Sequence, residues 1–144
     1  MAYTFQISVD SNDPHPLAAW WAETLGWEVE PSDEGFIKSM IAQGFASAED
    51  TTTFDGHLVW KEGAAIVSPE PGHGTARLLF QLVPEPKTTK NRVHLDVKVE
   101  EGGLADARAR LEARGATFLH DGEQGPHTWV TMADPQGNEF CVTE

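Results

Sequence analysis

His94 and Asp96 are two residues of this chain whose types and spacing suit chemistry. They occupy alternate positions of RVHLDV, residues 92–97, with apolar residues between them. This alternation is typical of a strand with one apolar face, and a merely solvated polar face needs neither residue. A histidine there can serve as an acid–base group or as a metal ligand. Same-face neighbours on a strand lie about 7 Å apart, so Asp96 is expected to orient His94 only indirectly, or to pair with Lys98 or a neighbouring strand.

A second stretch, FQISVD at residues 5–10, shows the same alternation. When the two stretches are superimposed position by position, Gln6 falls opposite His94 and Ser8 falls opposite Asp96. Two matching strands, each at the start of a longer segment, indicate a duplicated structural unit.

The first segment is expected to contain strands, one amphipathic helix and an insertion. The strands are predicted at residues 4–10, 27–31, 57–61, 64–68 and 76–83, and the helix at 13–26 with Asp13 as its cap. Within the insertion, 32–56, we expect an extra helix capped by Ser32 or Asp33 and then a polar loop at 46–56. The strands 57–61 and 64–68 are predicted to form a hairpin around Glu62–Gly63, and PEPGHG at 69–74 is predicted to turn the chain.

The second segment repeats the order of strand, helix and three strands after a connector at 84–91. Its elements are predicted at 92–99, 102–115, 117–120, 127–132 and 138–143. Because each helix must cover the apolar face of its own sheet, the opposite faces are exposed or line a cavity, and a curved pair of such sheets would enclose a cup. The residues expected to face this cup are Gln6, Ser8, Gln81, His94, Asp96, Glu139 and Cys141.

The composition of the chain limits the kinds of partner and compartment that can be expected for it. Its net charge of −13 opposes binding to nucleic acid, although Lys87, Lys90 and Arg92 form a small basic cluster that is either a solvated linker or an anion-binding lip. No apolar run is long enough to span a membrane, and the first residues lack the pattern of a secretion signal. The single cysteine, Cys141, excludes an internal disulfide, so a cytoplasmic protein is expected.

Four motifs resemble the glyoxalase-like proteins of the vicinal oxygen chelate superfamily, which also contains bleomycin-resistance proteins and extradiol dioxygenases. The motifs are D-P-x-x-L-A-x-x-W followed by L-G-W, then V-P-E-P-K-T-x-K-N-R, V-H-L-D-V and D-P-Q-G-N-E-F-C-V. The resemblance implies an α+β fold of two paired βαβββ modules that form a curved, cup-shaped mixed sheet with the helices on its outer face. The chain would then be one glyoxalase-like domain, 1–144, made of module one (1–83), the linker 84–91 and module two (92–144).

The resemblance also implies a metal site between the first and last strands of the modules. By position its ligands would be Gln6, Gln81, His94 and Cys141, with Glu139 as an alternative ligand. Metal-dependent members usually carry glutamate at the two last-strand positions, where this chain has Gln81 and Cys141. This set lacks the charge that Mg²⁺, Mn²⁺ or Fe²⁺ favours, whereas Zn²⁺, or Ni²⁺ among the softer ions, can accept an imidazole and a thiolate. Without a metal, His94 is a hydrogen-bonded imidazole and Cys141 a small buried residue.

Two functions are consistent with this pattern. The first is an enzyme that holds a small polar organic molecule in the cup, with His94 as its catalytic group, for lyase, isomerase or dioxygenase chemistry. The second is a protein of the bleomycin-resistance type that binds an antibiotic or metabolite without catalysis, and for which the acidic surface would favour a cationic ligand. Trp60 and Trp129 either supply an aromatic wall for the ligand or pack in the core. By analogy we expect a homodimer.

Overall fold

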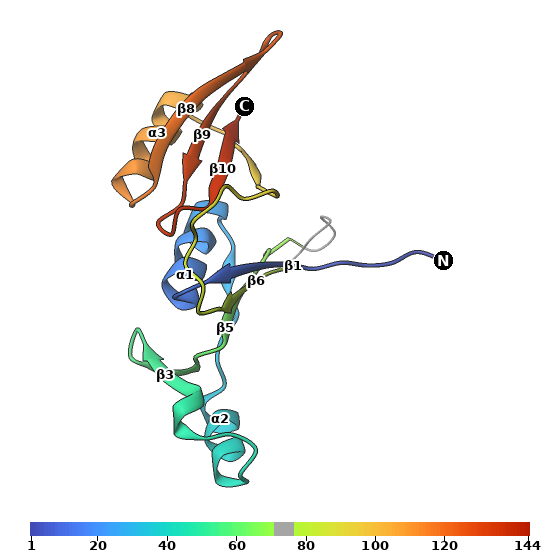
Figure 1. Cartoon of the computed structure of the whole chain (residues 1–144), viewed down its shortest axis with the longest axis vertical. Coiled ribbons are helices and arrows are strands. Elements are labelled where there is room, and N and C mark those ends of the chain that lie inside the picture. The colour runs from blue at the N-terminus through green and yellow to red at the C-terminus, as the bar shows by residue number, and fades with distance from the viewer. Residues whose placement is uncertain (71–76) are drawn as a thin grey trace. The chain divides into compact units, whose positions relative to one another are not determined.

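The two matching stretches lead into the edge strands of two four-stranded sheets. A computed structural model describes residues 1–70 and 77–144, and the chain divides into unit 1, Met1–Pro86, and unit 2, Lys87–Glu144. The part of PEPGHG beyond residue 70 lies outside the described residues. Figure 1 shows the elements of each unit.

Unit 1 contains a mixed sheet of four strands and one covering helix. In spatial order the strands are β1 (Ile7–Ser11), β6 (Arg77–Leu82), β5 (Gly63–Val67) and β2 (Glu28–Val29). β1 and β6 are parallel, and the other neighbours are antiparallel. Helix α1 (Pro14–Leu25) connects β1 to β2, so the element order is that of a βαβββ module.

Unit 2 repeats this topology strand for strand. Its sheet has the order β7 (Asp96–Lys98), β10 (Glu139–Thr143), β9 (His127–Ala133) and β8 (Thr117–Gln124), and α3 (Gly103–Ala113) connects β7 to β8. The first and last strands are again parallel neighbours. The predicted duplication and α+β fold class are therefore confirmed at the level of sheet topology within each unit.

The four-stranded sheet of unit 1, called sheet 1, is covered on one face, and that of unit 2 is called sheet 2. The alternation of side chains along the strands determines which face of sheet 1 is covered. Leu78 and Phe80 of β6 and Ile66 of β5 share one face by register and are almost completely buried, together with Leu17 and Trp21 of α1. α1 contacts both strands. Gly26 ends the helix in the left-handed conformation (φ 66°), which costs glycine little. The apolar face is thus sealed by α1, and the alternate residues point to the opposite side.

Sheet 2 is covered in the same way by α3. Phe140 and Val142 of β10 and Val130 and Met132 of β9 are buried and share one face. Ala107 and Leu111 are the buried residues of α3. Cys141 lies between Phe140 and Val142 in sequence, so its side chain points to the face that α3 does not cover.

The insertion differs from its prediction in one part. Asp33 caps α2 (Glu34–Ala42), as expected, by accepting a hydrogen bond from the backbone of Phe36. The polar loop expected at 46–56 is instead a short 3-10 helix, Ala48–Asp50, followed by strand β3 (Thr51–Phe54). β3 pairs with β4 (His57–Trp60) across the two-residue turn Asp55–Gly56, in which both residues have positive φ.

The hairpin predicted around Glu62–Gly63 is therefore wrong. β4 pairs with β3, whereas β5 pairs with β2 and β6. Two other expectations need smaller corrections. The strand expected at 92–99 is reduced to Asp96–Lys98, and the side chain of Asp13, at the N-cap of α1, accepts no capping hydrogen bond.

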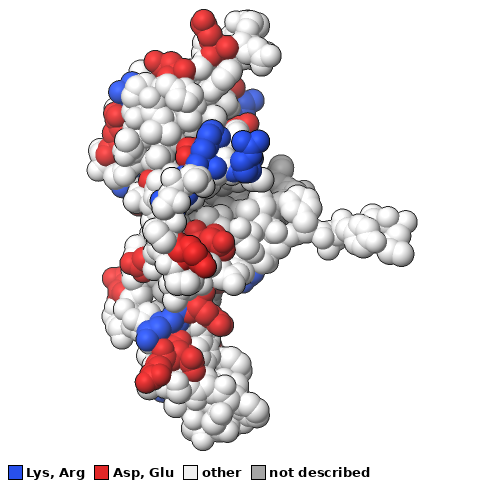
Figure 2. Space-filling model, viewed as in Figure 1, with Lys and Arg blue, Asp and Glu red and all other residues white. Residues whose placement is uncertain are grey.

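None of the helices in the described part of the chain is both long and apolar enough to cross a membrane. Figure 2 shows acidic side chains in several separate groups on the visible face, consistent with the net charge of −13.

Candidate functional site

His94, Asp96 and Cys141 come together on the uncovered side of sheet 2. Cys141 on β10 is paired in register with Asp96 on β7, and the backbone N–H of Cys141 donates to the carbonyl of Leu95 at 2.9 Å. One potential ligand atom from each of the three side chains lies within 4.8 Å of the other two. This is the only such group of three or more His, Cys, Asp or Glu residues within residues 1–70 and 77–144.

The contact between His94 and Asp96 is direct, which corrects the expectation of an indirect one. Nδ1 of His94 lies 3.2 Å from Oδ1 of Asp96. The estimate of about 7 Å assumed a regular strand through both residues. β7 begins only at Asp96, so His94 precedes the paired part of the strand and its side chain is not held to strict alternation. An ionised carboxylate can only accept a hydrogen bond, so Nδ1 of His94 donates to Asp96, and in a neutral ring this tautomer places the lone pair on Nε2.

Cys141 is half-buried rather than sealed in the core. Its Sγ lies 3.6 Å from Oγ1 of Thr131, the residue opposite it on β9. Thr131 is buried and was not among the predicted site residues. Its position opposite Cys141 depends on strand register, which the sequence pattern alone does not specify.

Glu139 lies on the same strand face as Cys141, but its carboxylate is already engaged. Oε1 accepts from Nζ of Lys87 at 3.0 Å, and Oε2 accepts from the backbone N–H of Asn91 at 3.0 Å. Burial of this carboxylate raises its pKa, but the hydrogen bonds from Asn91 and Lys87 outweigh that effect and lower the pKa from 4.5 to about 2. Through these two hydrogen bonds, Glu139 of β10 binds the segment 87–91, which precedes β7, and Lys87 supplies one of them.

Glu139→Gln is expected to lower the free energy of unfolding by about 1–3 kcal/mol at neutral pH, because the Lys87 ammonium loses its charged partner. A carboxylate whose pKa is lowered in the folded state contributes stability above its ordinary pKa and loses it as the pH falls from 4.5 towards about 2. Urea unfolding at roughly pH 7 and pH 3 should therefore show the difference between wild type and variant shrinking at the lower pH. An equal difference at both pH values would contradict this role.

Gln6, Ser8 and Gln81, predicted site residues of unit 1, lie on the uncovered side of sheet 1 or just before it. Ser8 and Gln81 share that face by register. Gln6 precedes β1, and its Oε1 accepts from Nη1 of Arg77 at 2.7 Å. Arg77 also donates to both oxygens of Glu30, at 2.7 and 2.9 Å. Hydrogen bonding to Arg77 lowers the pKa of Glu30, and the same pair raises the pKa of Arg77.

The two tryptophans have different surroundings. Trp60 of β4 lines a cavity in unit 1 together with Gln81. Trp129 of β9 lies against Gly122 of β8, where a Cβ atom would collide with the indole ring. Glycine at position 122 is therefore required by the packing of Trp129. Gln6, Ser8, Trp60 and Gln81 belong to unit 1, whereas His94, Asp96, Trp129, Glu139 and Cys141 belong to unit 2.

Comparison with protein families identifies the fold. A family model described as a glyoxalase-like domain matches residues 6–143. The chain belongs to the glyoxalase-like domain family. The closing motif recognised in the sequence, D-P-Q-G-N-E-F-C-V, forms a turn and then the last strand of this glyoxalase-like chain. Asp134 stabilises that turn by accepting from the backbone N–H groups of Gln136 and Asn138.

Solved structures give the same result for the fold. A member of the glyoxalase/bleomycin resistance protein/dioxygenase superfamily from Sphaerobacter thermophilus is 17% identical with a TM-score of 0.57, and the match covers 100% of this chain and 98% of the other. A mutant of the fosfomycin resistance protein FosX from Listeria monocytogenes, solved with Mn(II) and 1S,2S-dihydroxypropylphosphonic acid, is 10% identical with a TM-score of 0.63, covering 99% and 92%.

A third structure, the oxidase ChaP-H2, is 14% identical with a TM-score of 0.58, and the match covers 99% of this chain and 92% of the other. Comparison with curated protein sequences gives no match. The resemblance found in the sequence motifs is thus confirmed, and the structural neighbours include proteins with different activities.

Proposed function

We propose that this glyoxalase-like protein is a metal-dependent enzyme that acts on a small polar organic molecule at His94, Asp96 and Cys141. The convergence of these three donors on the uncovered face of sheet 2 carries the proposal. Two of them, His94 and Cys141, occupy positions at which the family resemblance implies metal ligands. The Mn(II) bound by the FosX mutant supports metal dependence by analogy.

The chemistry of the donors fits a borderline-soft divalent ion. An imidazole nitrogen, a carboxylate oxygen and a thiolate sulfur are ligands that Zn²⁺ accepts, and Ni²⁺ or Fe²⁺ also binds imidazole. Mn²⁺ prefers oxygen ligands, and this cluster supplies only one carboxylate. Because the Asp96 carboxylate accepts from Nδ1 of His94, the direct protein ligands would be Nε2 of His94 and Sγ of Cys141, which leaves coordination positions free for water or substrate.

Each residue has a distinct role in this proposal. Asp96 fixes the tautomer and orientation of His94 through the 3.2 Å contact to Nδ1, which directs the Nε2 lone pair to a metal or to a substrate proton. Cys141 supplies the thiolate, and Thr131 holds its sulfur from the side. A bound divalent ion would supply Lewis-acid polarisation of substrate oxygen atoms. Isomerase, carbon–sulfur lyase and dioxygenase reactions all benefit from that polarisation.

Turnover by the metal-loaded chain tests the proposal. Protein reconstituted with Zn²⁺, Ni²⁺, Fe²⁺ or Mn²⁺ is offered a hemithioacetal, an epoxide with a thiol, and a catechol with oxygen. We expect turnover of one class by wild type, and at least about a 100-fold loss in His94→Ala. Equal activity of His94→Ala and wild type, or no metal-stimulated activity with any class, would count against an enzyme.

Binding without turnover is the second candidate. It is favoured by the engagement of Gln6, whose amide oxygen is bound by Arg77, and by the neutral Gln81 at a position where metal-dependent relatives carry a carboxylate. In a thermal-shift screen, a compound that stabilises wild type and His94→Ala equally and is recovered unchanged would support sequestration.

We further propose that the protein is a cytoplasmic homodimer. β1 and β7 are edge strands, and Phe5 and Val93 beside them are 78% exposed, so each edge offers backbone groups and apolar area to a partner. A reducing compartment would keep Cys141 available as a thiol. Sedimentation at a monomer mass would contradict the dimer, and recovery of the native protein outside the cytoplasmic fraction would contradict the location.

A further inference from the structure

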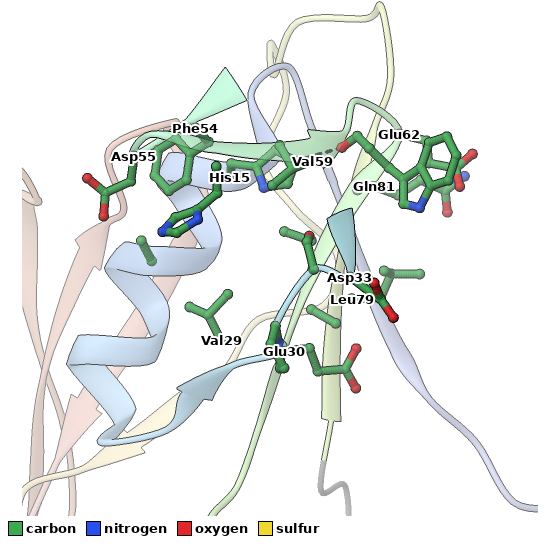
Figure 3. Close-up of a pocket in the computed structure, with 18 of the residues that line it drawn as sticks. His15, Val29, Glu30, Asp33, Phe54, Asp55, Val59, Glu62, Leu79 and Gln81 are labelled. Atoms are coloured by element: carbon green, nitrogen blue, oxygen red, sulfur yellow. Dashed lines mark hydrogen bonds between the residues drawn. The ribbon is translucent and has the colours of Figure 1, made fainter. Parts of the chain in front are cut away.

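A cavity of about 790 Å³ is built entirely from unit 1. Its lining combines Leu79 and Gln81 from the uncovered face of sheet 1 with Phe54 and Trp60 from the β3–β4 hairpin. Leu79, Gln81 and Phe54 are labelled in Figure 3. Small-molecule sites in proteins have volumes of about 300–1,000 Å³, so the cavity is large enough for an organic ligand. It depends in part on the insertion, which supplies strand β3 and the Asp55–Gly56 turn of the hairpin.

Aromatic side chains form one wall of this cavity. The ring of His15 stacks on Phe54 with centroids 5.6 Å apart. Nε2 of His15 donates to the carbonyl of Trp60 at 2.7 Å, since a carbonyl can only accept. These two contacts hold the hairpin against α1, and the Trp60 side chain lines the same cavity. Aromatic faces attract both flat organic rings and cations.

The charges around the cavity are unbalanced. Its lining contains four carboxylates, of Glu30, Asp33, Asp55 and Glu62, against one guanidinium, that of Arg77. Arg77 already pairs with the Glu30 carboxylate through two hydrogen bonds and donates a third to Gln6. The structure gives the Asp55 and Glu62 side chains no hydrogen bond or ion pair with any described residue. Figure 3 shows them at opposite ends of the cavity, with Glu62 beside Gln81.

The aromatic wall and the excess of carboxylates together favour one class of ligand over others. The excess negative charge disfavours an anion. A bare metal ion is disfavoured as well, because among the described residues the one group of three or more His, Cys, Asp or Glu side chains close enough to hold an ion is that at His94. An organic molecule with an apolar ring and a positive charge can use both the aromatic wall and a carboxylate.

We propose that the cavity under the β3–β4 hairpin binds an organic cation: an aromatic or apolar body that carries an ammonium or amidinium group. Phe54 and Trp60 contact the body, and Asp55 or Glu62 pairs with the charge. This site lies beyond the proposed metal-dependent function, because none of its residues belongs to the His94 cluster.

Calorimetric titration of the full-length protein with matched probes tests this proposal. The probes are tryptamine, benzylamine and benzamidine as cations, tryptophol as the neutral counterpart of tryptamine, and indole-3-acetate as the anion. EDTA is present throughout, so failure of the metal proposal leaves the outcome unaffected. We expect tryptamine to bind about five- to tenfold more tightly than tryptophol, with indole-3-acetate weakest, and the preference to decrease as salt is raised.

Two double variants separate the cavity from the general acidity of the protein. Asp55→Asn with Glu62→Gln should abolish the preference for tryptamine over tryptophol. Glu100→Gln with Glu101→Gln removes the same charge from exposed residues of unit 2 and should leave the preference unchanged. The proposal is overturned if the control pair weakens tryptamine equally, if tryptophol binds as well as tryptamine, or if no cation saturates the protein below about 10 mM.

Discussion

Cys141→Ser is expected to lower the affinity of the protein for Zn²⁺ by at least about 100-fold. Loss of a residue that merely orients a ligand typically costs about 10- to 100-fold in metal affinity, and Cys141 is proposed as a ligand itself. Serine keeps a hydrogen-bonding group beside Thr131, so β10 and β9 retain their pairing while the thiolate is lost. Competition with a chromophoric chelator measures the affinity.

Matched variants make the zinc result specific. His94→Ala should show a loss as large as that of Cys141→Ser. Asp96→Asn keeps a hydrogen-bonding oxygen but loses the charge, and should cost about 10- to 100-fold. Thr143→Ser changes a residue on the same face of β10 and should bind zinc as wild type does. Wild-type affinity in Cys141→Ser would exclude the thiolate as a ligand.

Phe140→Ala should have the largest effect on stability, a loss of about 3–5 kcal/mol in the free energy of unfolding. Phe140 is 1% exposed and pairs in register with Met132, which is 0% exposed. Alanine would remove the ring and leave a cavity beneath α3 that rigid neighbours cannot fill. Urea unfolding monitored by circular dichroism measures the loss.

A graded control identifies packing as the cause. Phe140→Leu retains most of the apolar volume and should cost less than about 2 kcal/mol. Val29→Ala, at a position that is 44% exposed, should cost much less than Phe140→Ala. A loss below about 1 kcal/mol in Phe140→Ala would show that the core under α3 does not stabilise the strand that presents Cys141.

The sequence predicted the order of elements because period-two alternation and helix end signals are local. The alternation of Phe140, Cys141 and Val142 was sufficient to place Cys141 on the face opposite α3. The echo between FQISVD and RVHLDV correctly indicated a duplicated unit, and the structure adds that each first strand is an edge strand parallel to the last strand of its unit. These features need no knowledge of distant contacts.

The errors arose where pairing or distance depends on distant residues. The Asp55–Gly56 pair is a strong hairpin signal and was absorbed into an expected polar loop, so β3 was missed. His94 was assigned strict strand geometry, although the paired part of β7 begins two residues later. The contacts of Gln6 with Arg77 and of Glu139 with Lys87 join residues 71 and 52 positions apart, which no local pattern reveals.

The central claim is that the uncovered face of sheet 2 gathers His94, Asp96 and Cys141 into one metal site. Crystals grown with ZnCl₂ test this directly by anomalous diffraction at the zinc absorption edge. We expect one peak at these residues, with a zinc–nitrogen distance of about 2.0–2.1 Å to His94 and a zinc–sulfur distance of about 2.3 Å to Cys141. A map without a peak there, or with zinc bound only at other residues, would contradict the account.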